Sequence, residues 1–154
     1  MKQIFRTIAI AFMLSVAAAP SFSQTGKTPT YPPIDSDALE QFGGPEGVRL
    51  WVESLFHFIM LDNRINKIFR EFGNIERQMY LNTQLLQLVL GGNDQEYQGA
   101  SMAAAHSDLG ITVTQFNAVV EAAYNACDRT NLTYEACNLM IAALAPFKHA
   151  IVTR

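Results

Sequence analysis

The sequence predicts a small all-α domain, and three observations support that class. Apolar residues recur three and four positions apart in several segments after residue 36, which is the spacing of one buried helix face. Capping residues and glycines stand at the ends of these segments, as they do at helix ends. No run of useful length alternates apolar and polar residues as a half-buried strand does.

Composition bounds the class of protein. The chain has 154 residues, of which 49% are hydrophobic and 16% are charged. These values are typical of one packed domain and not of a disordered chain. The formal net charge is −3, and no stripe of basic residues is visible. Because a nucleic-acid binder presents such a stripe to phosphates, we expect no nucleic-acid partner.

Residues 1–23 have the features of a secretory signal peptide. Lys2 and Arg6 form a positive start, and residues 8–19 form an apolar run that is short for a membrane span. Small serines then precede a cleavage point after Ser23. The alternative is an uncleaved membrane anchor.

Cleavage would leave two further parts. Residues 24–36 contain several prolines and are expected to form an extended arm, and residues 37–154 form the helical domain. We expect an exported, periplasmic chain with no membrane span once the signal is removed.

Local signals mark where the helices begin and end. Pro45 suits the first turn of a helix, and Thr112 with Gln115 forms a capping box. Gly91 is placed to end one helix, and Pro146 is placed to kink the last one. The expected helices are a short one opened by Asp37 and closed at Gly43, a longer one from Pro45, a short one capped by Asp62 and Asn63, residues 75–90, residues 102–107, residues 112 to about 128, and the chain from Tyr134 onward.

Two amides interrupt the apolar face expected for residues 75–90. Gln78 and Asn82 lie one helical turn apart and share that face. A buried amide needs a hydrogen-bond partner, so this pair suggests a bound ligand, although surface amides would be ordinary. The whole inward stripe is Ile75, Gln78, Met79, Asn82, Leu85, Leu86 and Val89.

The two cysteines lie on either side of a short turn. Cys127 falls near the end of one long helix, and Cys137 near the start of the next. Such helices are antiparallel neighbours, so opposite positions come close enough to bond. An exported chain meets an oxidising compartment, and we favour a disulfide over two buried cysteines that never meet.

Short motifs follow one another from Leu39 to the C-terminus. They are Phe42-Gly43-Gly44, Leu61-Asp62, Ile68-Phe69, Leu90-Gly91-Gly92, Tyr97-Gln98-Gly99, Met102 to His106, Leu109-Gly110-Ile111-Thr112, Phe116 and Ala145-Pro146. Their order and spacing resemble those of the group I truncated haemoglobins. The resemblance implies the two-over-two version of the globin fold and a haem cofactor, protoporphyrin IX with its iron.

The resemblance also implies roles for particular residues. His106 matches the proximal histidine that binds the haem iron, and Phe69 matches a phenylalanine that wedges against the haem. Phe56 matches the helix position above the iron on the distal side. Gln78 and Asn82 match two distal positions that face the bound gas.

These residue types suit the chemistry of a haem site. A neutral imidazole can fill the fifth coordination position of the iron and leave the sixth open. Aliphatic side chains such as Leu86 supply the apolar walls that a broad apolar disc requires. The alternative for His106 is an ordinary surface histidine, and the surrounding motifs argue against it.

This chain departs from the family pattern at two positions. Many members have a tyrosine where Phe56 stands, and phenylalanine cannot donate a hydrogen bond to a bound gas. Leu81 stands where a basic residue often holds a haem propionate. Arg70 and Arg77 are substitutes by their place in the sequence, or they simply face solvent.

Two other histidines are weighed against the same site. His57 follows Phe56 but points about 100° away on a helix, and we expect a partly buried packing residue. A sixth iron ligand from within the chain is the alternative for His57. We expect His149 to be solvated.

Three functions follow from these expectations. The favoured one is a gas-binding haemoprotein that binds O2 or another diatomic gas reversibly. A haem enzyme that oxidises nitric oxide or reduces peroxide is the alternative; the chain has no flavin or nicotinamide motif, so it would need an external reductase. A helical interaction module without haem is the third.

Overall fold

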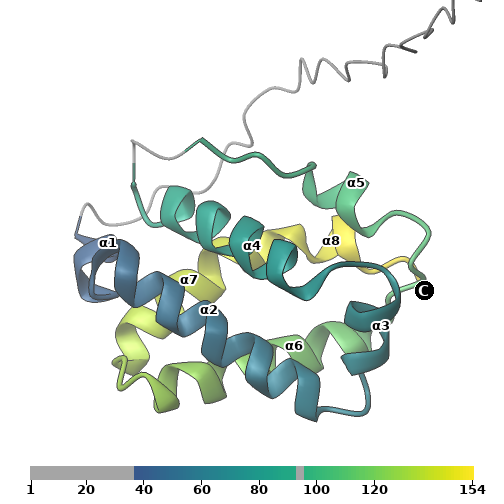
Figure 1. Cartoon of the computed structure of the whole chain (residues 1–154), viewed down its shortest axis with the longest axis horizontal. Coiled ribbons are helices and arrows are strands. Elements are labelled where there is room, and N and C mark those ends of the chain that lie inside the picture. The colour runs from purple at the N-terminus through teal and green to yellow at the C-terminus, as the bar shows by residue number, and fades with distance from the viewer. Residues whose placement is uncertain (1–36, 93–95) are drawn as a thin grey trace, which may run out of the picture.

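A computed structural model describes residues 37–92 and 96–154 of the chain (Figure 1). Every regular element among these residues is a helix, so the predicted all-α class is confirmed. No helix in the described ranges is long and apolar enough to cross a membrane. The predicted signal peptide (residues 1–23) and arm (residues 24–36) lie outside the described residues.

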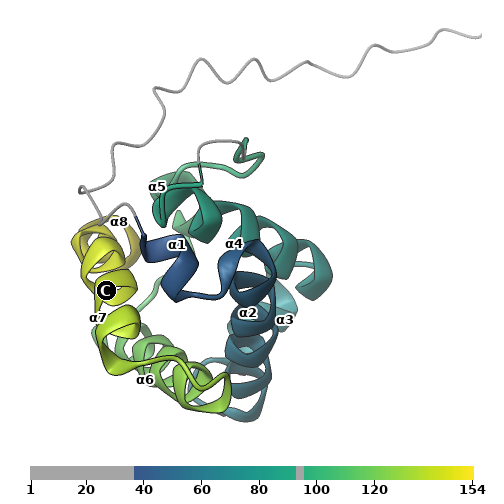
Figure 2. The same ribbon diagram turned by 90° about the vertical axis from the view of Figure 1, so that its left-hand side faces the viewer.

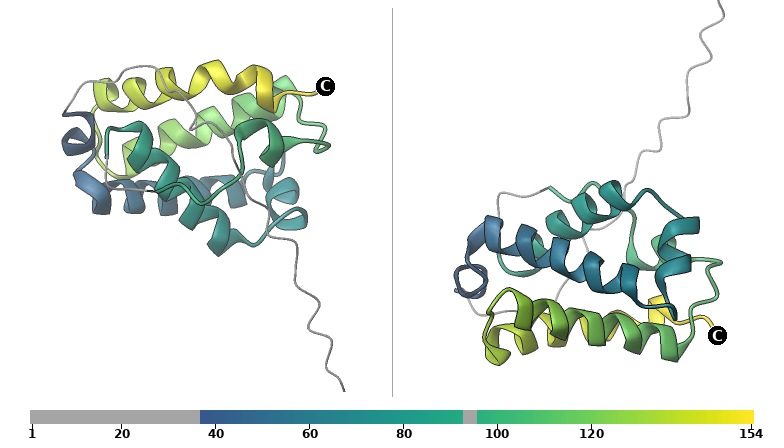
Figure 3. Two further views of the ribbon diagram at one scale, coloured as in Figure 1. Left: turned by 90° about the horizontal axis from the view of Figure 1, so that it is seen from above. Right: turned by 60° about the horizontal axis from the view of Figure 1, so that its bottom comes forward.

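The helices form two antiparallel pairs that pack against each other. In Figure 2, α2 and α4 lie on one side and α6 and α7 on the other. Figure 3 shows α2 lying along α6, which joins the two pairs. The expected two-over-two arrangement is therefore present. In chain order the elements are α1 (Ala38–Gln41), α2 (Gly44–Leu61), α3 (Asn66–Glu71), α4 (Ile75–Val89), α5 (Met102–His106), α6 (Val113–Arg129), α7 (Tyr134–Leu144), the 3-10 turn η1 (Ala145–Phe147) and α8 (Lys148–Ile151).

The core forms where α2 meets α6. Small side chains on α6 let the two helices approach closely, and large apolar side chains on α2 fill the space around them. The buried residues of α6 are Ala118, Ala122, Ala123, Ala126 and Cys127. The buried apolar residues of α2 are Val48, Trp51, Val52, Leu55, Phe56 and Ile59.

The predicted helix signals at the C-terminal half act as expected. The hydroxyl of Thr112 accepts a hydrogen bond from the Gln115 main-chain N–H, and the Gln115 side chain accepts from the Thr112 N–H, at 3.2 and 3.0 Å. This capping box opens α6. Pro146 interrupts the last helix, because the chain turns through η1 before α8 begins.

Gly91 ends α4 as predicted. Its φ angle is 92°, in the left-handed region that side chains disfavour. The Gly91 N–H donates to the Leu88 carbonyl at 3.2 Å, and the Gly92 N–H donates to the Gln87 carbonyl at 2.8 Å. This is the double hydrogen bond of a Schellman helix end.

The cap predicted for the short third helix is wrong. We expected Asp62 and Asn63 to cap it, but α3 starts at Asn66 after Ile65 and has no side-chain cap. The Asp62 carboxylate instead accepts from the main-chain N–H of Arg64 at 2.8 Å and pairs with its guanidinium. The nearby arginine competes with the helix for this carboxylate and lowers the pKa of Asp62.

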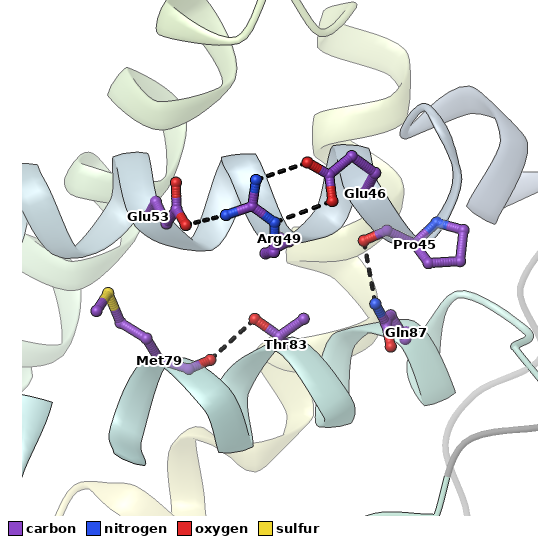
Figure 4. A network of polar contacts seen from close by, with 7 residues as sticks. All are labelled: Pro45, Glu46, Arg49, Glu53, Met79, Thr83 and Gln87. Carbon is purple, nitrogen blue, oxygen red and sulfur yellow. Dashed lines mark hydrogen bonds and ion pairs between the residues drawn. The ribbon is translucent and has the colours of Figure 1, made fainter. Parts of the chain in front are cut away.

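Figure 4 shows polar contacts along α2 and between α2 and α4. Arg49 lies between Glu46 and Glu53 and pairs with both. Its hydrogen bonds lower the pKa of Glu46, but these groups are exposed, so the ion pairs contribute little to stability. The Gln87 amide donates to the Pro45 carbonyl at 3.0 Å and ties the end of α4 to the start of α2.

The predicted disulfide joins α6 to α7. Cys127 and Cys137 are bonded and buried, with their Cα atoms 6.2 Å apart. The indole N–H of Trp51 donates to the sulfur of Cys127 at 3.1 Å. Because Trp51 belongs to α2, this contact ties both helix pairs together.

Replacing both Cys127 and Cys137 by alanine is expected to lower the free energy of unfolding by about 2–3 kcal/mol, because the unfolded chain loses a closed loop. Urea denaturation followed by the fluorescence of Trp51 measures the difference. The unmodified chain treated with a reductant should unfold at nearly the same urea concentration as the double variant. An unchanged unfolding free energy in the double variant would contradict the structural role given to this bond.

Candidate functional site

Three of the predicted site residues belong to one apolar cluster. Phe56 on α2 is only 2% exposed, and its ring meets the ring of Phe69 on α3 edge to face, with centroids 5.7 Å apart. Leu86 on α4 is buried in the same cluster. Three helices therefore contribute to this wall, and Phe69 remains half-buried at its edge.

Gln78 and Asn82 continue this cluster along α4. The Gln78 amide nitrogen donates to the Phe69 carbonyl at 3.2 Å, and the Asn82 amide nitrogen donates to the Gln78 carbonyl at 2.9 Å. Both side chains are half-buried. Main-chain carbonyls already accept one N–H of each amide, so the argument that an unpaired amide requires a ligand fails, while the expectation that both residues face a bound gas stays a prediction. Each amide group still has a second N–H.

Gly73 makes room for the Gln78 side chain. A Cβ atom at residue 73 would lie 2.0 Å from the amide nitrogen of Gln78. An alanine there would push the amide away from its place beside the turn between α3 and α4. Gly73 therefore helps to set where Gln78 points, which sequence reasoning did not identify.

His106 is the last residue of α5 and is half-buried. Its ring nitrogen Nδ1 lies 2.8 Å from the main-chain carbonyl oxygen of Met102. A carbonyl can only accept, so Nδ1 carries the proton and donates. In the neutral ring, the other nitrogen, Nε2, then has a lone pair, and this is the form of histidine that binds a metal. The spacing in the sequence could have indicated this contact, because Met102 precedes His106 by about one helical turn.

Both ends of α5 are held in place. The Ser101 hydroxyl accepts from the Ala104 N–H at 3.2 Å and caps the helix, which packs against α8 (Figure 1). After His106 the chain runs to Ile111, whose carbonyl accepts from the N–H groups of Thr153 and Arg154 at 2.9 and 3.2 Å. The C-terminus thus restrains the segment that follows the histidine.

The other two histidines, His57 and His149, are exposed. His57 is exposed, so the expectation of a partly buried residue is wrong. It lies on the outer face of α2 with Glu53, while its neighbour Phe56 faces the core. This placement does not favour His57 as a ligand within the chain. His149 is exposed, as expected.

The residues weighed as propionate partners lie at the surface of α3 and α4. Arg70 and Arg77 are exposed, and neither forms an ion pair with another described residue. Leu81 is half-buried. The arginines are therefore placed equally well to meet solvent or an anionic group.

Two surface hollows lie elsewhere on the described part of the chain. One, of about 500 Å³, is lined by residues that include Leu50, His57 and Arg129, and the other, of about 160 Å³, lies beside Leu61 and Glu121. None of the six predicted site residues lines either hollow. The structure thus brings Phe56, Phe69, Leu86, Gln78 and Asn82 together on α2, α3 and α4, and it holds the half-buried ring of His106 on α5 through Met102.

Sequence comparison finds relatives of one kind. No family model matches the chain. A group 1 truncated haemoglobin of Tetrahymena thermophila is 28% identical over 83 residues, which cover 54% of this chain and 67% of the relative. The group 1 truncated haemoglobin of Tetrahymena pyriformis is 26% identical over 82 residues, which cover 53% of this chain and 66% of the relative. The resemblance seen in the motifs is confirmed by these matches.

Solved structures show the same fold. A truncated haemoglobin of T. pyriformis in its Fe(III) form superimposes with a TM-score of 0.70 at 19% identity, over 76% of this chain and 98% of that chain. The 2/2 haemoglobin of Synechococcus sp. PCC 7002, with covalently attached haem, gives 0.69 at 24% identity over the same shares. A group II truncated haemoglobin of Bacillus anthracis gives 0.63 at 18% identity, over 82% of this chain and 94% of that chain. The predicted two-over-two globin fold is confirmed.

The hydrogen bond from His106 to Met102 predicts which nitrogen of the ring carries the proton. In the neutral ring of the full chain, Nδ1 should be protonated and Nε2 should not. Long-range ¹H–¹⁵N correlation spectra distinguish the two forms, with the exposed ring of His149 as a solvated reference. A neutral His106 protonated mainly at Nε2 would contradict the geometry described for this site.

Proposed function

Because the chain has the fold of the truncated haemoglobins, we propose that it binds one haem through His106 and reversibly binds O2 or another diatomic gas at the haem iron. The observation that carries this proposal is the His106 ring, whose Nδ1 is held by Met102 and whose Nε2 keeps its lone pair. The relatives named truncated haemoglobins support it.

The side chains present fit such a group. Haem is a broad apolar disc, and its affinity comes largely from apolar area removed from water. Several apolar side chains on α3, α4 and α6 stop short of full burial and offer such area. They are Phe69, Ile75, Met79, Phe116 and Val119.

Each protein group has a defined task at this site. When bound, haem supplies an iron whose sixth coordination position can take a diatomic gas. His106 would hold the iron through Nε2, and the Met102 carbonyl, which fixes the ring, would increase its basicity. Phe69 and Leu86 contribute apolar surface that keeps water away.

The distal side relies on amides instead of a hydroxyl. Phe56 has no donor to offer a bound gas. One side-chain N–H of Gln78 and one of Asn82 donate to main-chain carbonyls, so each amide has a second N–H left. We propose that these second N–H groups donate to a partly negative bound gas. The gas should therefore leave faster than from a site with tyrosine at residue 56.

Gas binding is preferred to catalysis because it requires less from outside the chain. Oxidation of nitric oxide or reduction of peroxide at the same site needs a reductase to restore the iron after each turnover. Reversible binding needs none. A sustained nitric oxide turnover with an added reductant would favour the enzyme.

We also propose that the chain is exported to the periplasm. The charge and apolar pattern of residues 1–23 is that of a signal peptide. The disulfide between Cys127 and Cys137 is typical of proteins in an oxidising compartment and supports this proposal.

Replacing His106 by glycine should abolish the Soret absorption of the purified protein, because the imidazole proposed to hold the iron is removed. Free imidazole, which fits the space left by the ring, should restore it. His149→Ala is the matched control and should keep the full spectrum, since that ring is exposed. A His106→Gly protein with the unchanged spectrum and haem content would refute the assignment.

Replacing Gln78 by leucine should raise the O2 dissociation rate by about tenfold, because one hydrogen bond to a partly charged ligand is lost. Gly73→Ala should act in the same direction by displacing that amide. Phe56→Tyr adds a hydroxyl and should slow dissociation. Stopped-flow kinetics measure these rates, with Glu76→Ala, at an exposed residue of the same helix, as the control.

If neither Gln78→Leu nor Gly73→Ala changes the dissociation rate, the Gln78 amide does not contact the gas. The assignment of the distal side to residue 78 would then be incorrect, while the role of His106 would be unaffected.

A further inference from the structure

Two buried glutamines on α4 hold different parts of the chain. Gln84 and Gln87 are each 8% exposed. Gln87 donates to the Pro45 carbonyl at the start of α2 (Figure 4). The Gln84 side-chain oxygen accepts from the main-chain N–H of Gln98 at 3.1 Å, and its amide nitrogen donates to the Tyr80 hydroxyl at 2.9 Å.

Gln98 belongs to the segment that leads into α5. Beside it, the Tyr97 hydroxyl donates to the Ala100 carbonyl at 3.0 Å, and burial raises the pKa of this hydroxyl. Tyr97 and Met102 pack against a small apolar cluster that includes Leu85 of α4. Apolar packing alone lets a short segment slide, because it has no preferred direction. The hydrogen bond from Gln98 to Gln84 fixes where along α4 this segment lies.

Met102 connects this segment to the histidine. It opens α5, contacts the small apolar cluster, and offers its carbonyl to His106 Nδ1. Since α5 is a single short helix, a shift at Met102 moves the acceptor that orients the ring. The position of the His106 ring therefore depends on the segment that Gln84 holds.

We propose that Gln84 is a positioning residue for His106, acting through Gln98 and Met102. Its effect on a cofactor rests on the proposed function, whereas its effect on the segment and on the ring does not. Gln98 is an exposed residue, so its main-chain N–H can bond to water when the Gln84 side-chain oxygen is removed. The loss should loosen this segment without unfolding the domain.

The chain offers a matched pair of variants to test this. Gln84→Met and Gln87→Met each remove one buried amide from the same helix while keeping the length of the side chain. In Gln84→Met, amide hydrogen exchange at Gln98 should accelerate about fivefold to tenfold, the effect of losing one ordinary hydrogen bond. Gln87→Met should leave that rate unchanged. Gln84→Glu keeps the acceptor oxygen and should restore slow exchange.

The second readout is the histidine itself. In the full chain without haem, the ¹⁵N signals of the His106 ring should show a smaller fraction protonated at Nδ1 in Gln84→Met, but not in Gln87→Met. In the haem-loaded ferrous protein, the iron–histidine stretching band should shift or broaden in the same variant. These results would support the proposal.

Failure of this inference and failure of the proposed function can be told apart. If no variant and not even the unaltered chain binds haem, the proposed function fails, and the exchange and ring signals still decide the role of Gln84. If Gln84→Met leaves the Gln98 exchange rate and the His106 ring signals as they are, the positioning role is overturned. Equal changes in Gln84→Met and Gln87→Met would also overturn it, because they indicate general destabilisation.

Discussion

The hydrogen bond between His106 Nδ1 and the Met102 carbonyl, 2.8 Å long, is the constraint on which the account of this molecule depends. It fixes the position of one proton, and so it leaves the lone pair on the opposite nitrogen. Met102 and His106 are the first and last residues of the short helix α5, and contacts from several parts of the chain hold this helix in place. The small apolar cluster and the Gln84 contact hold its start, α8 packs along it, and the C-terminus restrains the segment that follows.

The two helix pairs provide a rigid frame for this arrangement. Trp51 contacts the disulfide between α6 and α7 from within α2, so a covalent bond and a buried indole join both pairs at one end of the core. The cluster of Phe56, Phe69 and Leu86 lies on the side of α2 and α4. The aromatic and amide side chains of the predicted site thus lie on α2, α3 and α4, whereas His106 lies on α5, which follows the loop after α4.

Much of this fold could be predicted from the sequence because the signals are local. Helical spacing, the Thr112 capping box, Gly91 and Pro146 each act within a few residues of where they stand, and all are confirmed. Predictions failed where a distant or competing partner decides. Asp62 binds Arg64 instead of capping α3, and the Gln78 amide binds the Phe69 carbonyl, which belongs to another helix. No sequence pattern identifies which carbonyl a side chain will reach across a turn.

Under the proposed function, His106 binds the iron of one haem through Nε2. The most direct measurement is a haem titration of the full chain labelled with ¹⁵N-histidine, observed in the diamagnetic ferrous carbon monoxide form. We expect saturation at one haem per chain and a large shift of one ring nitrogen, Nε2 of His106, while the ring ¹⁵N signals of His57 and His149 stay unchanged. A shift at either of the other two histidines, or no stoichiometric complex, would contradict it.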